Sequence, residues 1–117
     1  MLIKKTAINT KNRSSIVEEG VEIAPIPVTE GESITIKYDG LLAKSGADKV
    51  YTHLGYGSSD SWKDIKDIPM KNTKGSWTCE ALAEQDRLNF CFHDTANNWD
   101  NNNGHNWSIT VHNGSLS

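Results

Sequence analysis

The stretch Leu88-Asn-Phe-Cys-Phe-His93 decides the fold, because its large apolar residues occupy every second position. Side chains alternate between the two faces of a β-strand, so a period of two predicts a strand with one face in a core. The same alternation recurs at 34–38, 50–56 and 107–111, and turn residues separate these segments. No segment has the pattern of a convincing helix. Several short strands separated by turns predict an all-β fold, an antiparallel β-sandwich.

The length of the chain, 117 residues, fits one domain with one core. Alternation begins at Val21, so we expect a single domain at 21–117 after a leading segment, 1–20, that is partly disordered or connecting. No stretch approaches the roughly 20 apolar residues of a membrane span, which argues against a membrane partner. The chain starts with Met1 and lacks an apolar run typical of a signal peptide, so we expect a cytoplasmic location.

Charge and cysteine content exclude further classes. The net charge is −3 and the 12 basic residues are scattered, which argues against nucleic-acid binding. The two cysteines are Cys79 and Cys91. If 77–82 and 88–93 form a hairpin, alternation places the two thiols on opposite sides of the sheet. We therefore expect both thiols to be free.

The four tryptophans divide into two pairs. Trp77 and Trp107 each begin an alternating strand pattern, which predicts that they pack in the core. Trp62 and Trp99 instead lie in polar loops without apolar partners at strand spacing. One such tryptophan would be taken first as a plug at the edge of the core. Two of them in separate loops favour display towards a ligand.

The loop from Asp94 to Asn106 contains six asparagines around Trp99. Pyranose rings stack their C–H faces on indoles, and their hydroxyls bond to amides and carboxylates. These residues therefore favour a ligand with many hydroxyl groups. His53 shares a strand face with Tyr51, and its spacing alone favours a half-exposed polar residue over a third ring in a site.

The sequence gives little support for metal binding or catalysis. The loop after Asp94 lacks the glycine and the closing glutamate of a calcium-binding EF-hand. Cys91 and His93 share a strand face without a paired motif typical of zinc. Neither a nucleophile elbow nor a glycine-rich phosphate loop is present. We therefore expect no metal, no cofactor and no enzymatic activity.

Three motifs together resemble a known group of modules. They are Val50-Tyr-Thr-His-Leu-Gly-Tyr56 followed by Trp62; Gly75-Ser-Trp77 leading to Leu88-Asn-Phe-Cys-Phe-His-Asp94; and Asn97-Asn-Trp-Asp-Asn-Asn-Asn-Gly104 followed by Asn106-Trp-Ser-Ile-Thr-Val111. From about Ile34 to Val111, the chain resembles the starch-binding carbohydrate-binding modules of the family 25 and family 53 type.

This resemblance implies an immunoglobulin-like β-sandwich that binds α-glucans such as starch, glycogen or malto-oligosaccharides without catalysis. It implies an aromatic platform and a hydrogen-bonding loop, Asp94 to Asn103. The platform would be His53, Trp62 and Trp99, and the weaker choices for hydrogen bonding are Asn98, Asp100 and Asn101. Such modules usually sit beside an amylase or synthase domain, so a glucan-active enzyme is a potential partner. A protein-interaction sandwich with tryptophan hot spots is the alternative function.

Overall fold

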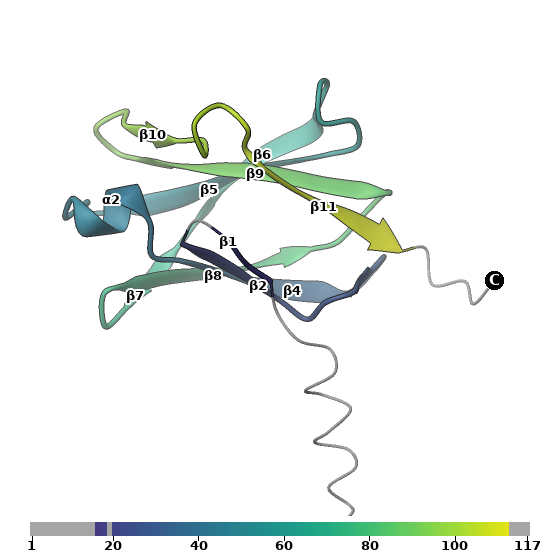
Figure 1. Ribbon diagram of the computed structural model, residues 1–117, viewed down its shortest axis with the longest axis horizontal. Coiled ribbons are helices and arrows are strands. Elements are labelled where there is room, and N and C mark those ends of the chain that lie inside the picture. The colour runs from purple at the N-terminus through teal and green to yellow at the C-terminus, as the bar shows by residue number, and fades with distance from the viewer. Residues whose placement is uncertain (1–15, 19, 113–117) are drawn as a thin grey trace, which may run out of the picture.

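The computed structural model describes residues 16–18 and 20–112, which form two facing β-sheets (Figure 1). Every strand pair within the first sheet is antiparallel. Its strands are, in spatial order, β1 (Ile16–Glu18), β2 (Val21–Ala24), β4 (Ser33–Tyr38), β8 (Ser76–Leu82) and β7 (Lys71–Thr73). The central strand of this sheet, β4, pairs along its full length with β8.

The second sheet has β9 near its centre. Its strands are, in spatial order, β3 (Val28–Thr29), β11 (Trp107–His112), β9 (Arg87–Asp94), β5 (Val50–Tyr56) and β6 (Lys63–Pro69), with β10 (Trp99–Asp100) also paired to β9. The pair of β3 and β11 is parallel, and the other pairs are antiparallel. Since β5 and β9 pair along seven residues, their outward side chains form regular rows.

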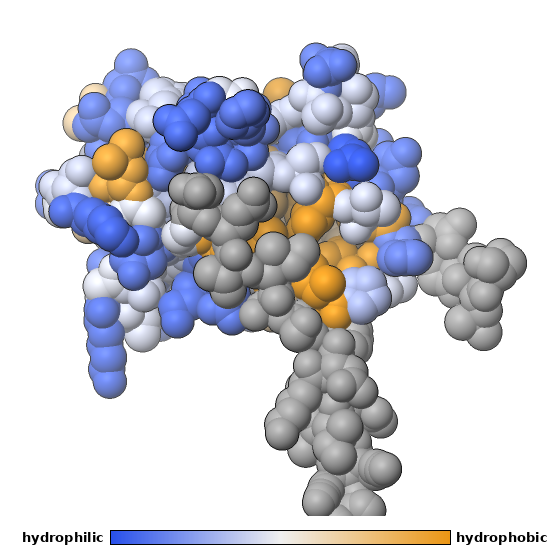
Figure 2. All heavy atoms as spheres, in the orientation of Figure 1, coloured by the Kyte–Doolittle hydropathy of each residue, from blue (hydrophilic) through white to orange (hydrophobic). Residues whose placement is uncertain are grey.

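The core lies between the two sheets. Along β4 the side chains alternate strictly between exposed and buried, as the period-two pattern predicts. From the other sheet, the rings of Phe90, Phe92 and Trp107 pack together, with Phe92 and Trp107 centroids 5.2 Å apart. Figure 2 shows hydrophobic side chains gathered between the layers, while hydrophilic ones cover much of the upper layer. Burial of these aromatic and aliphatic side chains is the main stabilising contribution.

The all-β, immunoglobulin-like sandwich expected from the sequence is confirmed. The core positions of Trp77 and Trp107 are also confirmed, since they are only 6% and 4% exposed. The suggested hairpin between 77–82 and 88–93 is wrong: β8 lies in the first sheet and β9 in the second. The connection between them therefore crosses from one layer to the other. It includes Ala83, which is fully buried between them.

One short helix departs from the expectation that the chain has none. Helix α2 (Leu41–Lys44) is a single turn between β4 and β5. Its Leu42 is buried in the core, and Leu42 N–H donates to the Tyr38 hydroxyl. A four-residue turn is too short to show helical periodicity in a sequence.

Both thiols are free, as predicted. The Cys79 sulfur lies 3.3 Å from Thr52 Oγ1. Cys91 is paired with His53 across β5 and β9 and is buried. Burial, with the nearby charge of Asp67 adding to it, raises the pKa of the Cys91 thiol to about 12. Such a thiol stays protonated and unreactive at neutral pH.

Most of the expected leading segment, residues 1–15 and 19, lies outside the described residues. The part that is described, β1, pairs with β2, so Ile16–Glu18 belongs to the first sheet. The strand-like pattern in the sequence starts only at Val21. Among the described residues, no helix is long and apolar enough to cross a membrane.

Candidate functional site

The outward face of the second sheet gathers polar and aromatic side chains from three neighbouring strands. In the strand register, Tyr51 of β5 lies opposite His93 of β9, and His53 of β5 lies opposite Asp67 of β6. Residues in register share a face of the sheet and lie close together. The imidazole of His93 stacks on the Tyr51 ring, with centroids 5.2 Å apart. This face is therefore built by register between strands that are distant in sequence.

Trp62 lies against this face because β5 has a glycine there. A side-chain carbon on Gly55 would come within 2.7 Å of Trp62 Cβ and 3.0 Å of Trp62 Cε3. The Trp62 indole N–H donates to the Ser59 carbonyl at 3.0 Å, which holds the ring at the edge of the loop. Trp62 is half-buried, with its ring centroid 6.0 Å from that of His53.

Trp99 reaches the same face from the other side. It belongs to the two-residue strand β10, and its register partner on β9 is His93. The Trp99 centroid lies 4.4 Å from that of His93 and 5.1 Å from that of His53. The indole N–H donates to Asn97 Oδ1, and the side chain is 44% exposed. Trp99 is thus held at its polar edge while much of its surface remains accessible.

These side chains form an aromatic cluster. Its members are Tyr51, His53, Trp62, His93 and Trp99. The structure brings together all three residues that the resemblance assigns to the platform. It adds Tyr51 and His93. The sequence could have placed each of them on an outward face, because each alternates with the apolar residues of its own strand. What the sequence lacked was the register that aligns the two strands.

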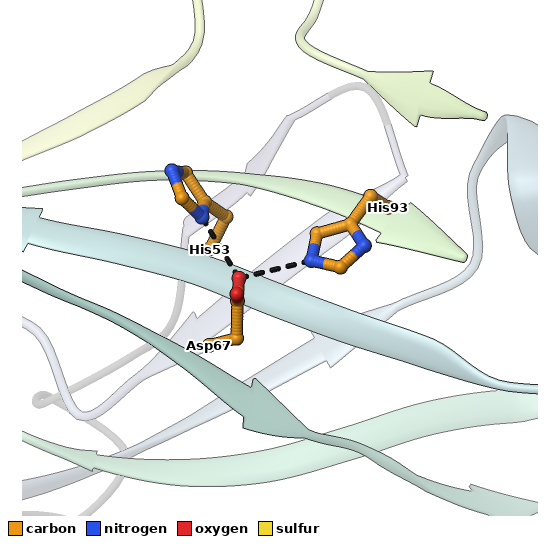
Figure 3. A group of neighbouring side chains, drawn as sticks. All are labelled: His53, Asp67 and His93. Atoms are coloured by element: carbon orange, nitrogen blue, oxygen red, sulfur yellow. Dashed lines mark hydrogen bonds and ion pairs between the residues drawn. The ribbon is translucent and has the colours of Figure 1, made fainter. Parts of the chain in front are cut away.

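Asp67 links the two histidines of the cluster (Figure 3). Its Oδ1 lies 2.8 Å from His53 Nδ1 and 2.9 Å from His93 Nε2. Partial burial raises the pKa of the Asp67 carboxyl, but the hydrogen bonds from both histidines outweigh it, and the net pKa is below its ordinary value. The carboxylate therefore keeps its charge at neutral pH and orients both rings. Sequence reasoning missed Asp67, which has no local motif.

The asparagine-rich loop after β9 is ordered by its own side chains. Asp94 accepts bonds from the Ala96 and Asn98 backbone N–H groups and from the Asn98 amide. The bonds from the Asn98 side chain and backbone lower the pKa of Asp94. Asn101 Oδ1 accepts from the Gly104 N–H. Thus Asn98 and Asn101, both exposed, already have partners in the loop, and their assignment to ligand binding stays a prediction.

Asp100 connects the loop to the core. Its carboxylate accepts a 2.5 Å bond from the Tyr38 hydroxyl, which in turn accepts from Leu42 N–H of α2. Burial and the bond to Asp100 raise the pKa of the Tyr38 hydroxyl. The other Asp100 oxygen accepts from the Asn102 N–H. Asp100 therefore holds β10 and α2 in place, and its predicted role as a direct ligand contact stays untested.

Tyr38→Phe should lower the free energy of unfolding by about 1–3 kcal/mol, because it leaves the buried Leu42 N–H without its partner and removes the hydrogen bond to Asp100 Oδ2. Urea denaturation followed by fluorescence measures this change. Tyr51→Phe, which removes a hydroxyl from the outward face, is the matched control. An unchanged urea midpoint for Tyr38→Phe would show that the hydrogen bond between Tyr38 and Asp100 contributes nothing to stability.

A hollow of about 550 Å³ lies beside Trp99. It is enclosed by α2 and the segment after it on one side and by the loop after β9 on the other. Leu41, Asp48, Asn98 and Trp99 are among the residues that line it. The aromatic cluster thus continues into a groove that offers both apolar and hydrogen-bonding groups.

A β-sandwich that exposes clustered aromatic rings beside polar loops has the architecture of a carbohydrate-binding module. Residues 34–90 match the model of a starch/carbohydrate-binding module family, family 53. Through this segment, the chain is similar to the starch-binding modules of the family 25 and family 53 type. The recognition made from the sequence motifs is therefore confirmed.

Two known proteins are similar to the chain. An alpha-amylase of Clostridium acetobutylicum is 35% identical over 87 residues, which are 72% of this chain and 11% of that enzyme. The chain thus spans about a tenth of the length of this relative. The structure of an iodinated family 25 module from a Bacillus halodurans amylase covers 74% of this chain and 92% of its own, with 22% identity and a TM-score of 0.48.

Proposed function

We propose that His53, Trp62 and Trp99 form the platform on which this starch-binding module holds an α-glucan, and that it does so without cleaving it. One observation carries the proposal. Three segments distant in sequence place these rings on one face. The ring centroid of His53 lies 6.0 Å from that of Trp62 and 5.1 Å from that of Trp99. A cluster of partly exposed rings with polar edges suits the alternating C–H faces and hydroxyls of a glucan.

The tautomer of His53 supports a direct contact between its ring and the sugar. The Asp67 carboxylate can only accept a hydrogen bond, so the proton of the neutral His53 ring is on Nδ1. Nε2 then carries a lone pair that can accept a bond from a sugar hydroxyl. Asp67 therefore acts as a positioning residue, because it fixes which nitrogen of His53 faces the ligand.

The groove beside Trp99 supports binding of more than one glucose unit. A chain stacked on Trp62 and Trp99 can continue between α2 and the loop after β9, where Asp48 and Asn98 offer hydrogen-bonding groups. We expect longer malto-oligosaccharides to bind more tightly than maltose for this reason.

The hydrogen bonds accepted by the nearby carboxylates support binding without catalysis. Asp67 is bound by two histidines, Asp94 caps its own loop, and Asp100 is bound by Tyr38. Each of these three carboxylates is thus held by hydrogen bonds within the protein, whereas glycoside hydrolysis uses a pair of carboxyl groups directed at the scissile bond. Because a similar segment forms part of an alpha-amylase, we propose a glucan-active enzyme as the partner of this module.

The expected result for ligand choice is retention by glycogen or starch and little retention by microcrystalline cellulose. Affinity gel electrophoresis and calorimetry with maltoheptaose measure it. A shallow platform predicts dissociation constants between roughly millimolar and micromolar, or about −4 to −8 kcal/mol. Equal retention on cellulose would refute the specificity, and release of reducing sugar from starch would refute the non-catalytic role. A lack of any glucan binding would favour a protein partner instead.

Gly55→Ala should weaken maltoheptaose binding by displacing Trp62, because the new methyl group collides with Trp62 Cβ. We expect a loss of several-fold, up to that of Trp62→Ala itself, since stacking on an aromatic ring is worth about 1–3 kcal/mol. Calorimetry on Gly55→Ala, Trp62→Ala and the double variant tests whether the loss of affinity passes through Trp62. If Gly55→Ala weakens binding equally with and without Trp62, its effect does not pass through Trp62.

A further inference from the structure

Two imidazole nitrogens of the aromatic cluster converge on one carboxylate oxygen of Asp67 (Figure 3). His53 Nδ1, His93 Nε2 and a carboxylate oxygen of Asp67 lie within 4.8 Å of one another. They come from three adjacent strands, β5, β9 and β6, whose pairing holds the backbones together. The side chains are partly exposed, with His53 at 27%, His93 at 17% and Asp67 at 48%, so solvent and ions can reach them.

Both ring nitrogens of His93 have a hydrogen-bond acceptor beside them, which is unusual for a neutral histidine. His93 Nδ1 lies 3.1 Å from the Asp94 backbone carbonyl, while Nε2 lies 2.9 Å from the Asp67 carboxylate. Both partners can only accept hydrogen bonds, but a neutral imidazole has one N–H group. An Nδ1–H group that donates to the Asp94 carbonyl leaves the Nε2 lone pair facing the Asp67 carboxylate, an arrangement that a metal ion between them would satisfy. An Nδ1–H group that donates to a backbone carbonyl is also the usual support of a histidine that binds metal through Nε2.

We propose that His53 Nδ1, His93 Nε2 and the Asp67 carboxylate bind a divalent transition-metal ion of the zinc, copper or nickel class. Imidazole and carboxylate donors suit these ions, whereas calcium and magnesium prefer sites built from oxygen alone. The carboxylate withdraws so that the ion sits between the rings, with bonds of about 2.0–2.2 Å. Water completes the coordination on the exposed side, and binding displaces protons from the two rings.

This proposal differs from the sequence-based expectation of no metal. Asp67 is 14 residues from His53 and 26 from His93, so no short motif could reveal the group. His53 also belongs to the proposed glucan platform, but metal binding does not require a bound glucan, because it depends only on the three donor side chains.

Calorimetric titration of the full chain with zinc chloride, in the absence of glucan, tests the site. We expect one ion per chain, with affinity at least about tenfold weaker in His53→Gln, His93→Gln or Asp67→Asn. His105→Gln and His112→Gln, which change exposed histidines elsewhere, should bind zinc like the unchanged chain. Circular dichroism and the urea midpoint of each variant separate loss of ligands from loss of folding.

A second readout locates the ion. Binding of Cu²⁺ should quench indole fluorescence, because His93 lies 4.4 Å from Trp99 and His53 lies 6.0 Å from Trp62, measured between ring centroids. Nitrogen NMR should show that the chemical shifts of His53 Nδ1 and His93 Nε2 change when the ion binds. The proposal is overturned if zinc does not bind at millimolar concentration, or if zinc binding and copper quenching persist unchanged in both His53→Gln and His93→Gln.

Discussion

Replacing Trp99 with alanine should weaken maltoheptaose binding between several-fold and about a hundredfold while leaving the thermal midpoint nearly unchanged. The ring is 44% exposed, and its indole N–H bonds only within its own loop, to Asn97. Stacking on an aromatic side chain contributes about 1–3 kcal/mol in the comparable case of nucleic-acid bases. Each 1.4 kcal/mol is about a tenfold change in affinity, which gives the expected range.

Calorimetry with maltoheptaose and thermal unfolding of the same samples measure the two effects. Leu82→Ala is a matched control, because Leu82 is also 44% exposed but belongs to β8 in the other sheet. It should change neither quantity appreciably. If Trp99→Ala instead unfolds the domain, Trp99 is a structural plug and the platform assignment is wrong.

The other platform residues should follow in a graded manner. Trp62→Ala should weaken binding by a similar factor but also lower stability slightly, since Trp62 is half-buried against Gly55. His53→Ala should have a milder effect on binding, because an imidazole offers a smaller stacking face than an indole. Fluorescence should report ligand binding through Trp62 and Trp99, while Trp77 and Trp107 stay silent in the core.

The layers of the sandwich were predictable because strand alternation is a local property. The pattern in Leu88 to His93 identifies which side chains face inward without any knowledge of the partner strand. It does not identify the partner itself. A short link such as 83–86 can close a hairpin or cross between sheets, and the local sequence does not distinguish the two. This is why the suggested pairing of 77–82 with 88–93 was wrong.

The candidate site was predictable only in part for the same reason. Trp62 and Trp99 were evident as large rings in polar surroundings, and the motif around His53 carried the family resemblance. Asp67 and His93 gain their significance from register across β6, β5 and β9. That register depends on the whole sheet, so their bonds to one another leave no trace in the spacing of the sequence.

Replacing Trp107 with alanine should have the opposite effect to Trp99→Ala, lowering the free energy of unfolding by about 3–5 kcal/mol through an unfilled cavity. Trp107 is 4% exposed, and its ring lies parallel to Phe90, with centroids 6.2 Å apart, and edge-on to Phe92 at 5.2 Å. Small domains are stable by only about 5–15 kcal/mol, so this loss removes a large share of the total.

Equilibrium denaturation in urea measures the loss as a shift of the midpoint without a change of slope. Trp107→Phe, which keeps an apolar ring in the same space, should be destabilised much less. At a temperature where Trp107→Ala remains folded, its affinity for maltoheptaose should match that of the unchanged chain, because the ring lies between the sheets and the ligand binds on the outward face. If Trp107→Ala keeps its urea midpoint but loses glucan binding, the division of the tryptophans into core and platform is wrong.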